Sequence, residues 1–187
     1  MVKVAVLASG SGSNFEKIVL GEENYKVDLL IVDRENAYAL ERGKNLGVQG
    51  IYVNPKSFSS KGKYEEKIIE LLEEREIEWI FLAGYMRIIS KTLLEKYPER
   101  IVNIHPSYLP KFPGKRAIED AYENKVSETG VTIHYVDEGV DTGKIIAQEK
   151  IKIDSGWTLD KLQEEVHRVE HRLYPQIIKK LVEENKK

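Results

Sequence analysis

An asparagine and a histidine lie two positions apart in residues 102–110, which read VNIHPSYLP. Because alternate residues of a β-strand project from the same face, Asn103 and His105 are expected to lie side by side. Pro106 disfavours the helical region for the residue before it and so keeps His105 extended. An amide N–H can stabilise an oxyanion and an imidazole can transfer protons, which together suit addition to a carbonyl group. A plain turn at the end of a strand is the alternative role for His105.

A loop rich in glycine and serine follows the first apolar run, and residues 9–14 read SGSGSN. Its backbone N–H groups and the start of a following helix would favour an anion, and a phosphate is the expected ligand. Phe15 stands where the dinucleotide fingerprint has its third glycine, and the P-loop lysine is absent. Asp33, about twenty residues later, keeps a nicotinamide interpretation open. The alternative is an ordinary helix N-cap supplied by Ser13 or Asn14.

Two carboxylates further along the chain are candidates for a site. Asp141 lies in the turn DEGVDTG of residues 137–143, where an Asx-turn hydrogen bond is its ordinary role. Glu170 lies at the edge of an apolar helical stripe, where a partly buried carboxylate needs a structural partner or a ligand. His167 and His171 are four residues apart, but no Glu or Cys completes a known metal spacing. Surface packing is the favoured interpretation of this pair, and we predict no catalytic metal.

Short β-branched runs alternate with amphipathic helical patterns in the first two thirds of the chain. The clearest helical pattern covers residues 64–75, and the runs cover residues 3–7, 28–32, 49–53, 79–82 and 101–104. This alternation predicts an α/β fold with a mainly parallel sheet and helices on both faces. Residues 131–136 and 145–153 have no helix between them and predict an antiparallel C-terminal extension. A final helix is expected over residues 158–184.

The 187 residues suit a single domain, which we expect to span positions 1–187. A net charge of −2 and the lack of a basic stretch give no reason to expect nucleic acid as a partner. The chain has no Cys, no signal-peptide pattern and no apolar run long enough for a membrane, so we expect a cytoplasmic protein. A homodimer is left open, because the sequence does not distinguish an exposed apolar face from a core face.

Taken together, four motifs resemble the phosphoribosylglycinamide formyltransferase family in their order and spacing, over nearly the whole chain. They are SGSGSN at 9–14, LAGYMRI at 82–88, NIHPSYLP at 103–110 and DEGVDTG at 137–143. Asn-x-His-Pro-Ser with a downstream Asp marks the wider folate-dependent superfamily, while the N-terminal loop and residues 170–175 single out the purine enzyme. The resemblance implies a Rossmann-like fold, with phosphate bound by the first half and folate by the second.

The implied reaction is formyl transfer from the cosubstrate 10-formyltetrahydrofolate to the amine of glycinamide ribonucleotide, in de novo purine synthesis. By the same resemblance, the catalytic residues are Asn103, His105 and Asp141. The amine would attack the formyl carbon directly, with Asn103 and protonated His105 stabilising the oxyanion. Asp141 would hold the imidazole charged and relay protons through water.

The resemblance also assigns the binding residues. The ribonucleotide would contact Gly12, Ser13, Asn14 and Glu170. The folate would contact Met86, Arg87, Ile88, Ile89 and Asn103, largely through backbone groups that read the pterin edge, and Lys61 aligns with a basic residue of the folate side.

The chain departs from the family pattern at three places. Residues 115–118 replace a stretch that usually contains His, His167 stands where relatives often carry Lys or Gln, and Lys144 replaces a usual proline. These changes leave room for another amine acceptor, since methionyl-tRNA and sugar-nucleotide formyltransferases share the same trio. Those relatives generally have an extra C-terminal domain, which we do not expect here. A redox or non-catalytic nucleotide-binding module built on the loop and Asp33 is the remaining alternative, and it gives the trio no shared purpose.

Overall fold

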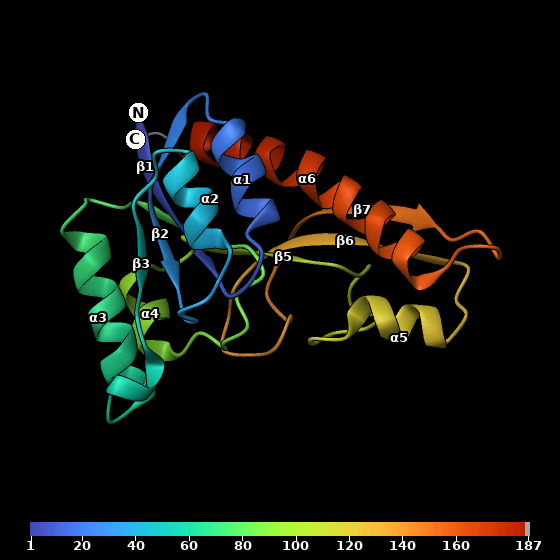
Figure 1. Cartoon of the computed structure of the whole chain (residues 1–187), viewed down its shortest axis with the longest axis horizontal. Helices are drawn as coiled ribbons and strands as arrows, with labels where there is room; N and C mark the ends of the chain where they lie inside the picture. The colour runs from blue at the N-terminus through green and yellow to red at the C-terminus, as the bar shows by residue number, and fades with distance from the viewer. Residues whose placement is uncertain (186–187) are drawn as a thin grey trace.

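The computed structural model describes residues 1–185, and across this range seven strands form one sheet in the order β3-β2-β1-β4-β5-β6-β7 (Figure 1). Neighbouring strands from β3 to β5 are parallel, whereas β6 and β7 pair antiparallel. The predicted mainly parallel sheet with an antiparallel extension is therefore confirmed. The strands are β1 (Val2–Ala8), β2 (Tyr25–Val32), β3 (Gly50–Tyr52), β4 (Trp79–Leu82), β5 (Ile101–His105), β6 (Glu128–Tyr135) and β7 (Ile145–Lys152).

Two of the helices, α3 and α6, begin at a residue whose side chain caps them. Ser60 Oγ accepts the Lys63 N–H at the start of α3, and Thr158 Oγ1 accepts the Lys161 N–H at the start of α6. The cap at Ser60 explains why α3 begins three residues before the predicted helix of residues 64–75. The helices are α1 (Ser13–Leu20), α2 (Ala39–Asn45), α3 (Lys61–Glu73), α4 (Lys91–Lys96), α5 (Ala117–Glu123) and α6 (Leu159–Glu184), with a 3₁₀ turn at Pro55–Ser57.

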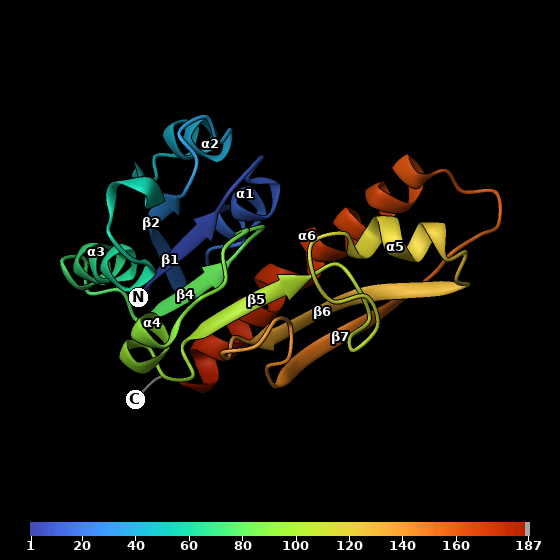
Figure 2. The same ribbon diagram turned by 90° about the horizontal axis from the view of Figure 1, so that it is seen from below.

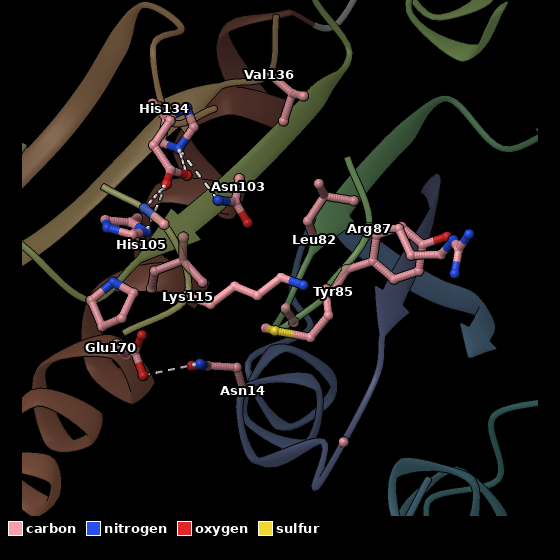
Figure 3. Close-up of a pocket in the computed structure, with 18 of the residues that line it drawn as sticks. Asn14, Leu82, Tyr85, Arg87, Asn103, His105, Lys115, His134, Val136 and Glu170 are labelled. Atoms are coloured by element: carbon pink, nitrogen blue, oxygen red, sulfur yellow. Dashed lines mark hydrogen bonds and ion pairs between the residues drawn. The ribbon is translucent and has the colours of Figure 1, made fainter. Parts of the chain in front are cut away.

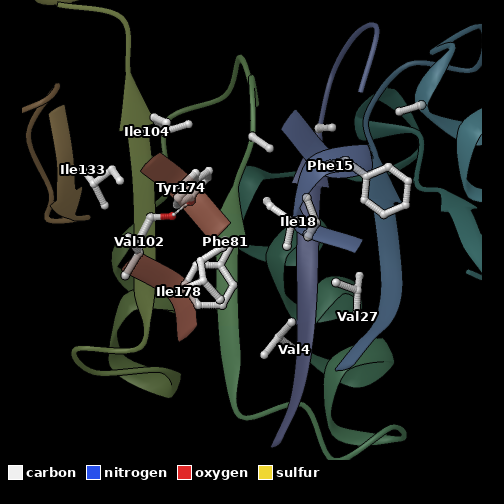
Figure 4. Close-up of a cluster of buried hydrophobic side chains, with 14 of the residues drawn as sticks. Val4, Phe15, Ile18, Val27, Phe81, Val102, Ile104, Ile133, Tyr174 and Ile178 are labelled. Carbon is white, nitrogen blue, oxygen red and sulfur yellow. Dashed lines mark hydrogen bonds between the residues drawn. The ribbon is translucent and has the colours of Figure 1, made fainter. Parts of the chain in front are cut away.

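Both faces of the parallel part of the sheet are buried, as the continuous apolar runs predict. In β1, Val4 and Val6 belong to a core shared with α1, α2 and α6, whereas Ala5 and Leu7 belong to a core shared with α3 and α4. Figure 4 shows the first core, and Figure 2 shows α6 passing behind β4 and β5. The period of two in a strand thus places successive residues of β1 in two different cores.

One buried hydroxyl joins α6 to the centre of the sheet. Tyr174 Oη lies 3.0 Å from the carbonyl oxygens of both Leu82, the last residue of β4, and Val102, the second residue of β5. Burial raises the pKa of Tyr174 well above its ordinary value, and the charge of Glu170 acts in the same direction. The residue therefore stays a neutral donor and holds the two strands that lead into the site.

None of the helices in residues 1–185 combines the length and the apolar character that crossing a membrane requires.

Candidate active site

A cavity of about 330 Å³ opens where the carboxyl ends of β1, β4 and β5 meet (Figure 3). Ligands bind at this edge in open α/β sheets because the loops that leave the strands gather there. The cavity brings together all but one of the residues predicted for the site. Its lining includes residues 10–14, 82–89, 103–106, 114–115, 134, 136–137, 139–141, 167 and 170.

His105 ends β5 and is buried, with an acceptor at each of its ring nitrogens. Its Nδ1 lies 3.4 Å from Asp141 Oδ2, and its Nε2 lies 2.8 Å from the carbonyl oxygen of Phe112. Two acceptors facing two ring nitrogens suit the doubly protonated ring, in which both nitrogens carry a proton. The pairing of Asp141 with His105 is thus present, although His105 ends β5 and Asp141 lies in the turn between β6 and β7.

Asp141 is held by the backbone as well as by histidine. Its Oδ2 accepts the Gly114 N–H at 2.8 Å, and its own φ of 54° is left-handed, a conformation that Asp tolerates in turns. Burial by itself would raise the pKa of Asp141, but His134, the Gly114 N–H and the charge of His105 together lower it below its usual value. The carboxylate is therefore ionised at neutral pH.

Asn103 faces a second histidine that the sequence did not single out. Asn103 and His134 are direct partners in the antiparallel pairing of β5 and β6, and Asn103 Nδ2 lies 3.3 Å from His134 Nε2. His134 Nδ1 donates to the carbonyl oxygen of Tyr135 at 2.8 Å, and its Nε2 also lies 3.6 Å from Asp141 Oδ1. An Asn amide nitrogen carries two protons, so one remains for a ligand in the cavity.

The glycine-rich loop enters α1 without a side-chain cap. Gly12 is the N-cap residue, with a left-handed φ of 74°, and no side chain there bonds the first-turn N–H groups. The ordinary cap by Ser13 or Asn14 is therefore wrong. A Cβ atom at Gly12 would lie 2.8 Å from the Cα atom of Ala39, so the close approach of α2 also requires glycine. The uncapped helix end faces the cavity and favours an anion.

Glu170 is buried in α6 and reaches the first turn of α1. Its Oε2 accepts from Asn14 Nδ2 at 3.2 Å (Figure 3) and from His167 Nδ1 at 2.8 Å. His171 Nε2 lies 3.1 Å from Ser13 Oγ, which makes a second link between the helix and the loop. The structural partner that a buried carboxylate needs is thus the loop itself, and the carboxylate still borders the cavity.

Residues 86–89 form the opposite wall of the cavity. The Met86 N–H donates to Ser9 Oγ at 2.8 Å, which fixes the segment to the end of β1. Met86 and Ile88 expose apolar surface, while Ile89 is buried. The Arg87 guanidinium lies 4.0 Å from the buried carboxylate of Asp33, so Asp33 pairs with a cation of this wall.

Lys61 is the one predicted residue that the structure does not bring to this cavity. It is the first residue of α3, is exposed, and does not appear among the described residues that line the cavity.

Comparison with known proteins places the chain in a family. The formyl transferase family profile matches residues 2–178. The chain is 48% identical over 186 residues to the phosphoribosylglycinamide formyltransferase of Bacillus subtilis, covering 97% of this chain and 95% of that protein. The chain belongs to the phosphoribosylglycinamide formyltransferase family. The resemblance inferred from the four motifs is therefore confirmed.

Solved structures agree with this assignment of the enzyme. The phosphoribosylglycinamide formyltransferase of Streptococcus pneumoniae superposes with a TM-score of 0.93 at 48% identity, over 97% of this chain and 99% of that one. Glycinamide ribonucleotide transformylase 1 of Geobacillus kaustophilus gives a TM-score of 0.94 at 49% identity, again over 97% and 99%. The chain is also 36% identical to the human trifunctional purine biosynthetic protein adenosine-3, covering 92% of this chain and 18% of that protein.

Two residues of the site were missed by reasoning from the sequence. His134 stands in an apolar strand, where nothing local indicates that it faces Asn103, because the facing depends on the register of β5 against β6. Lys115 was noted only as a departure from the family pattern. It borders the cavity, and Figure 3 shows its side chain extending across it toward Tyr85.

Within residues 1–185, no group of three or more His, Asp or Glu side chains is arranged to hold a metal ion. His167 and His171 stack with ring centroids 6.0 Å apart and bond to Glu170 and Ser13 respectively. The absence of a catalytic metal stays a prediction.

Proposed function

We propose that the enzyme transfers the formyl group of 10-formyltetrahydrofolate to the amine of phosphoribosylglycinamide, in de novo purine synthesis. The products are formylglycinamide ribonucleotide and tetrahydrofolate. The observation that carries this proposal is the meeting of Asn103, His105 and Asp141 in one cavity, between an uncapped helix start and the wall of residues 86–89. The names of the similar proteins, which include a trifunctional purine biosynthetic protein, support the same reaction.

Asn103 and His105 stabilise the negative charge that develops on the formyl oxygen. The substrate amine attacks the formyl carbon and forms a tetrahedral adduct without a covalent link to the enzyme. The free amide proton of Asn103 donates to its oxyanion, and the His105 imidazolium contributes its positive charge from the neighbouring position on the same face of β5. Asn103 thereby touches both the oxyanion and the folate that supplies the formyl group.

Asp141 keeps His105 charged and completes the proton balance. The attacking nitrogen loses a proton, the bond from the formyl carbon to the folate nitrogen breaks, and that nitrogen gains a proton. The ionised carboxylate 3.4 Å from His105 Nδ1 favours the imidazolium form and can pass protons through water.

The ribonucleotide occupies the side of the cavity at the start of α1. Gly12, Ser13 and Asn14 receive the phosphate through backbone N–H groups and the positive end of the helix. Glu170, which borders the cavity beside Asn14, contacts the ribonucleotide through its carboxylate.

The folate occupies the opposite wall. Met86, Arg87, Ile88 and Ile89 present backbone donors and acceptors to the pterin ring, and the apolar side chains of Leu82 and Val136 border the same space. A flat heteroaromatic ring fits such a wall because its edge needs hydrogen bonds and its faces need apolar contact. Lys61 stays a prediction for the folate side, although its place at the start of α3 lies outside the cavity lining.

The remaining predictions follow from this assignment. We place the phosphate-binding half before the folate-binding half in a single domain over residues 1–187. The partners are small molecules, and nucleic acid and membrane are not among them. A cytoplasmic location and a possible homodimer also stay predictions.

A formyl-transfer assay tests the proposal. The purified protein is mixed with 10-formyltetrahydrofolate and glycinamide ribonucleotide, and the release of tetrahydrofolate is followed by absorbance. Turnover is expected with this acceptor and is expected to be absent with methionyl-tRNA or an amino-sugar nucleotide. Turnover with either alternative in place of glycinamide ribonucleotide would contradict the proposed acceptor, and binding of NAD without any formyl transfer would contradict the reaction.

A further inference from the structure

His167 stands at the edge of the cavity where the glycine-rich loop meets α6. It lies one turn before Glu170, borders the cavity and has about half of its side chain exposed. A single oxygen, Glu170 Oε2, is 2.8 Å from His167 Nδ1 and 3.2 Å from Asn14 Nδ2. The imidazole is therefore separated from the loop by one carboxylate oxygen.

The hydrogen bond to Glu170 determines which ring nitrogen of His167 gains or loses a proton. Because the carboxylate only accepts, Nδ1 carries a proton in both charge states of the ring. In the neutral ring Nε2 has a lone pair and no proton, which repels an anion. In the imidazolium form Nε2 becomes a charged N–H donor, which attracts one. Protonation of His167 thus replaces repulsion of a phosphate by a favourable charged hydrogen bond.

The charged and titratable groups around the ring favour a single positive charge on the stacked pair of His167 and His171. Burial lowers the pKa of the stacked neighbour His171, and the charges of Lys17 on α1 and Arg42 on α2 act in the same direction. Glu170 faces His167 from the same helix, and Lys115 borders the same cavity from the segment before α5. The neutral form of His171 is favoured beside Ser13 Oγ, so the positive charge of the pair belongs to His167.

We propose that His167 is a proton-dependent contact for the phosphate of the acceptor, so that ribonucleotide binding takes up a proton and weakens as the pH rises. This inference rests on the proposed function, because it places the ribonucleotide phosphate at residues 12–14. His167 would then determine the pH range of substrate binding. Relatives often carry Lys or Gln at this position, and neither of these side chains changes its charge near neutral pH.

The direction of the effect follows from Glu170. The hydrogen bond from Glu170 raises the pKa of His167 above its ordinary value and outweighs the burial that would lower it. The imidazolium form therefore persists to a higher pH than in an ordinary histidine and is lost as the pH rises through the raised pKa. A bound dianionic phosphate stabilises the same form, which is why binding and proton uptake are coupled.

Ribose 5-phosphate is a suitable probe because it lacks the titratable amine of the substrate and is largely dianionic above pH 7. Its dissociation constant is measured from pH 7 to pH 9 for the wild type, His167→Lys and His167→Gln. The wild type is expected to lose about tenfold in affinity over this range, close to the roughly 1.4 kcal/mol of one charged hydrogen bond. His167→Lys should show a much flatter profile, and His167→Gln should bind weakly throughout.

Calorimetry in buffers of different ionisation enthalpy gives a second readout that a merely structural residue would not affect. Proton uptake on binding is expected for the wild type and not for His167→Lys. Arg168→Gln is the matched control, because it removes a positive charge from the next residue, which is exposed and paired with Glu165. That variant should keep the affinity and the pH profile of the wild type.

The outcomes separate this inference from the function on which it rests. Parallel pH profiles in the wild type, His167→Lys and His167→Gln, without proton uptake, would overturn the role of His167 and leave the reaction unaffected. A wild type that formylates glycinamide ribonucleotide but does not bind ribose 5-phosphate would overturn the phosphate assignment and this inference with it. Loss of formyl transfer in the wild type would instead contradict the proposed function.

Discussion

Asn103 and His134 lie directly opposite each other on β5 and β6, with 3.3 Å between Asn103 Nδ2 and His134 Nε2. The amide and the imidazole are within hydrogen-bond distance of each other, and both residues border the cavity. Cross-strand partners on one face of a sheet hold each other's side chains in place. The donor proposed for the oxyanion is therefore oriented before any substrate binds.

Asn103→Ala is expected to reduce turnover by 10²–10³, about 2.7–4 kcal/mol, because it removes one oxyanion donor. The dissociation constant of the folate should change much less, since the amide acts mainly on the charge of the adduct. Steady-state kinetics and a folate titration measure the two quantities separately. Near-normal turnover in this variant would show that Asn103 is not an oxyanion donor.

Asp141→Asn should lower turnover steeply while the folate and the ribonucleotide still bind. The substitution keeps an oxygen for the Gly114 N–H and removes the negative charge beside His105, so the loss is electrostatic. Stopped-flow single-turnover measurements isolate the chemical step from binding. Preserved activity would reduce Asp141 to a turn residue.

The stability of the protein in acid should depend on the same carboxylate. Because the pKa of Asp141 is lowered in the folded state, its ionisation stabilises the fold above the ordinary range of an aspartate and loses that effect as the pH falls. The free energy of unfolding should therefore fall more between pH 6 and pH 3 in the wild type than in Asp141→Asn. Urea titrations at both pH values test this, and equal losses would contradict it.

Gly12→Ala should weaken ribonucleotide binding and leave folate binding largely intact. A Cβ atom there would lie 2.7 Å from Ala39 Cβ on α2, and the φ of 74° strains any residue other than glycine. Gly10→Ala is the comparison, because a Cβ atom at that position meets nothing within 4 Å. Equal weakening of both ligands by Gly12→Ala would indicate a folding defect instead.

Tyr174→Phe is expected to destabilise the fold by about 1–3 kcal/mol, since two buried carbonyl oxygens lose their donor and nothing replaces it. The carbonyls belong to Leu82 and Val102, in the strands that lead into the cavity. Urea denaturation followed by circular dichroism measures the change. An unchanged midpoint would mean that another donor reaches these carbonyls.

Local sequence determined most of the secondary structure and the first pair of site residues. The apolar runs predicted all seven strands to within about three residues at each end, and the final helix begins one residue after its predicted start, because these features depend on neighbouring residues. The placement of Asn103 and His105 on one face followed from strand geometry and the proline after them. Motif order was enough to identify the family.

Tertiary structure decided which distant groups meet. The facing of Asn103 by His134 depends on the pairing register of two antiparallel strands, and the approach of Asp141 to His105 depends on a turn 36 residues further along the chain. The contact of Glu170 with Asn14, across 156 residues, depends on how α6 packs against α1. Such contacts arise from packing between elements, which no local pattern encodes, and for the same reason the place of Lys61 outside the cavity could be found only in three dimensions.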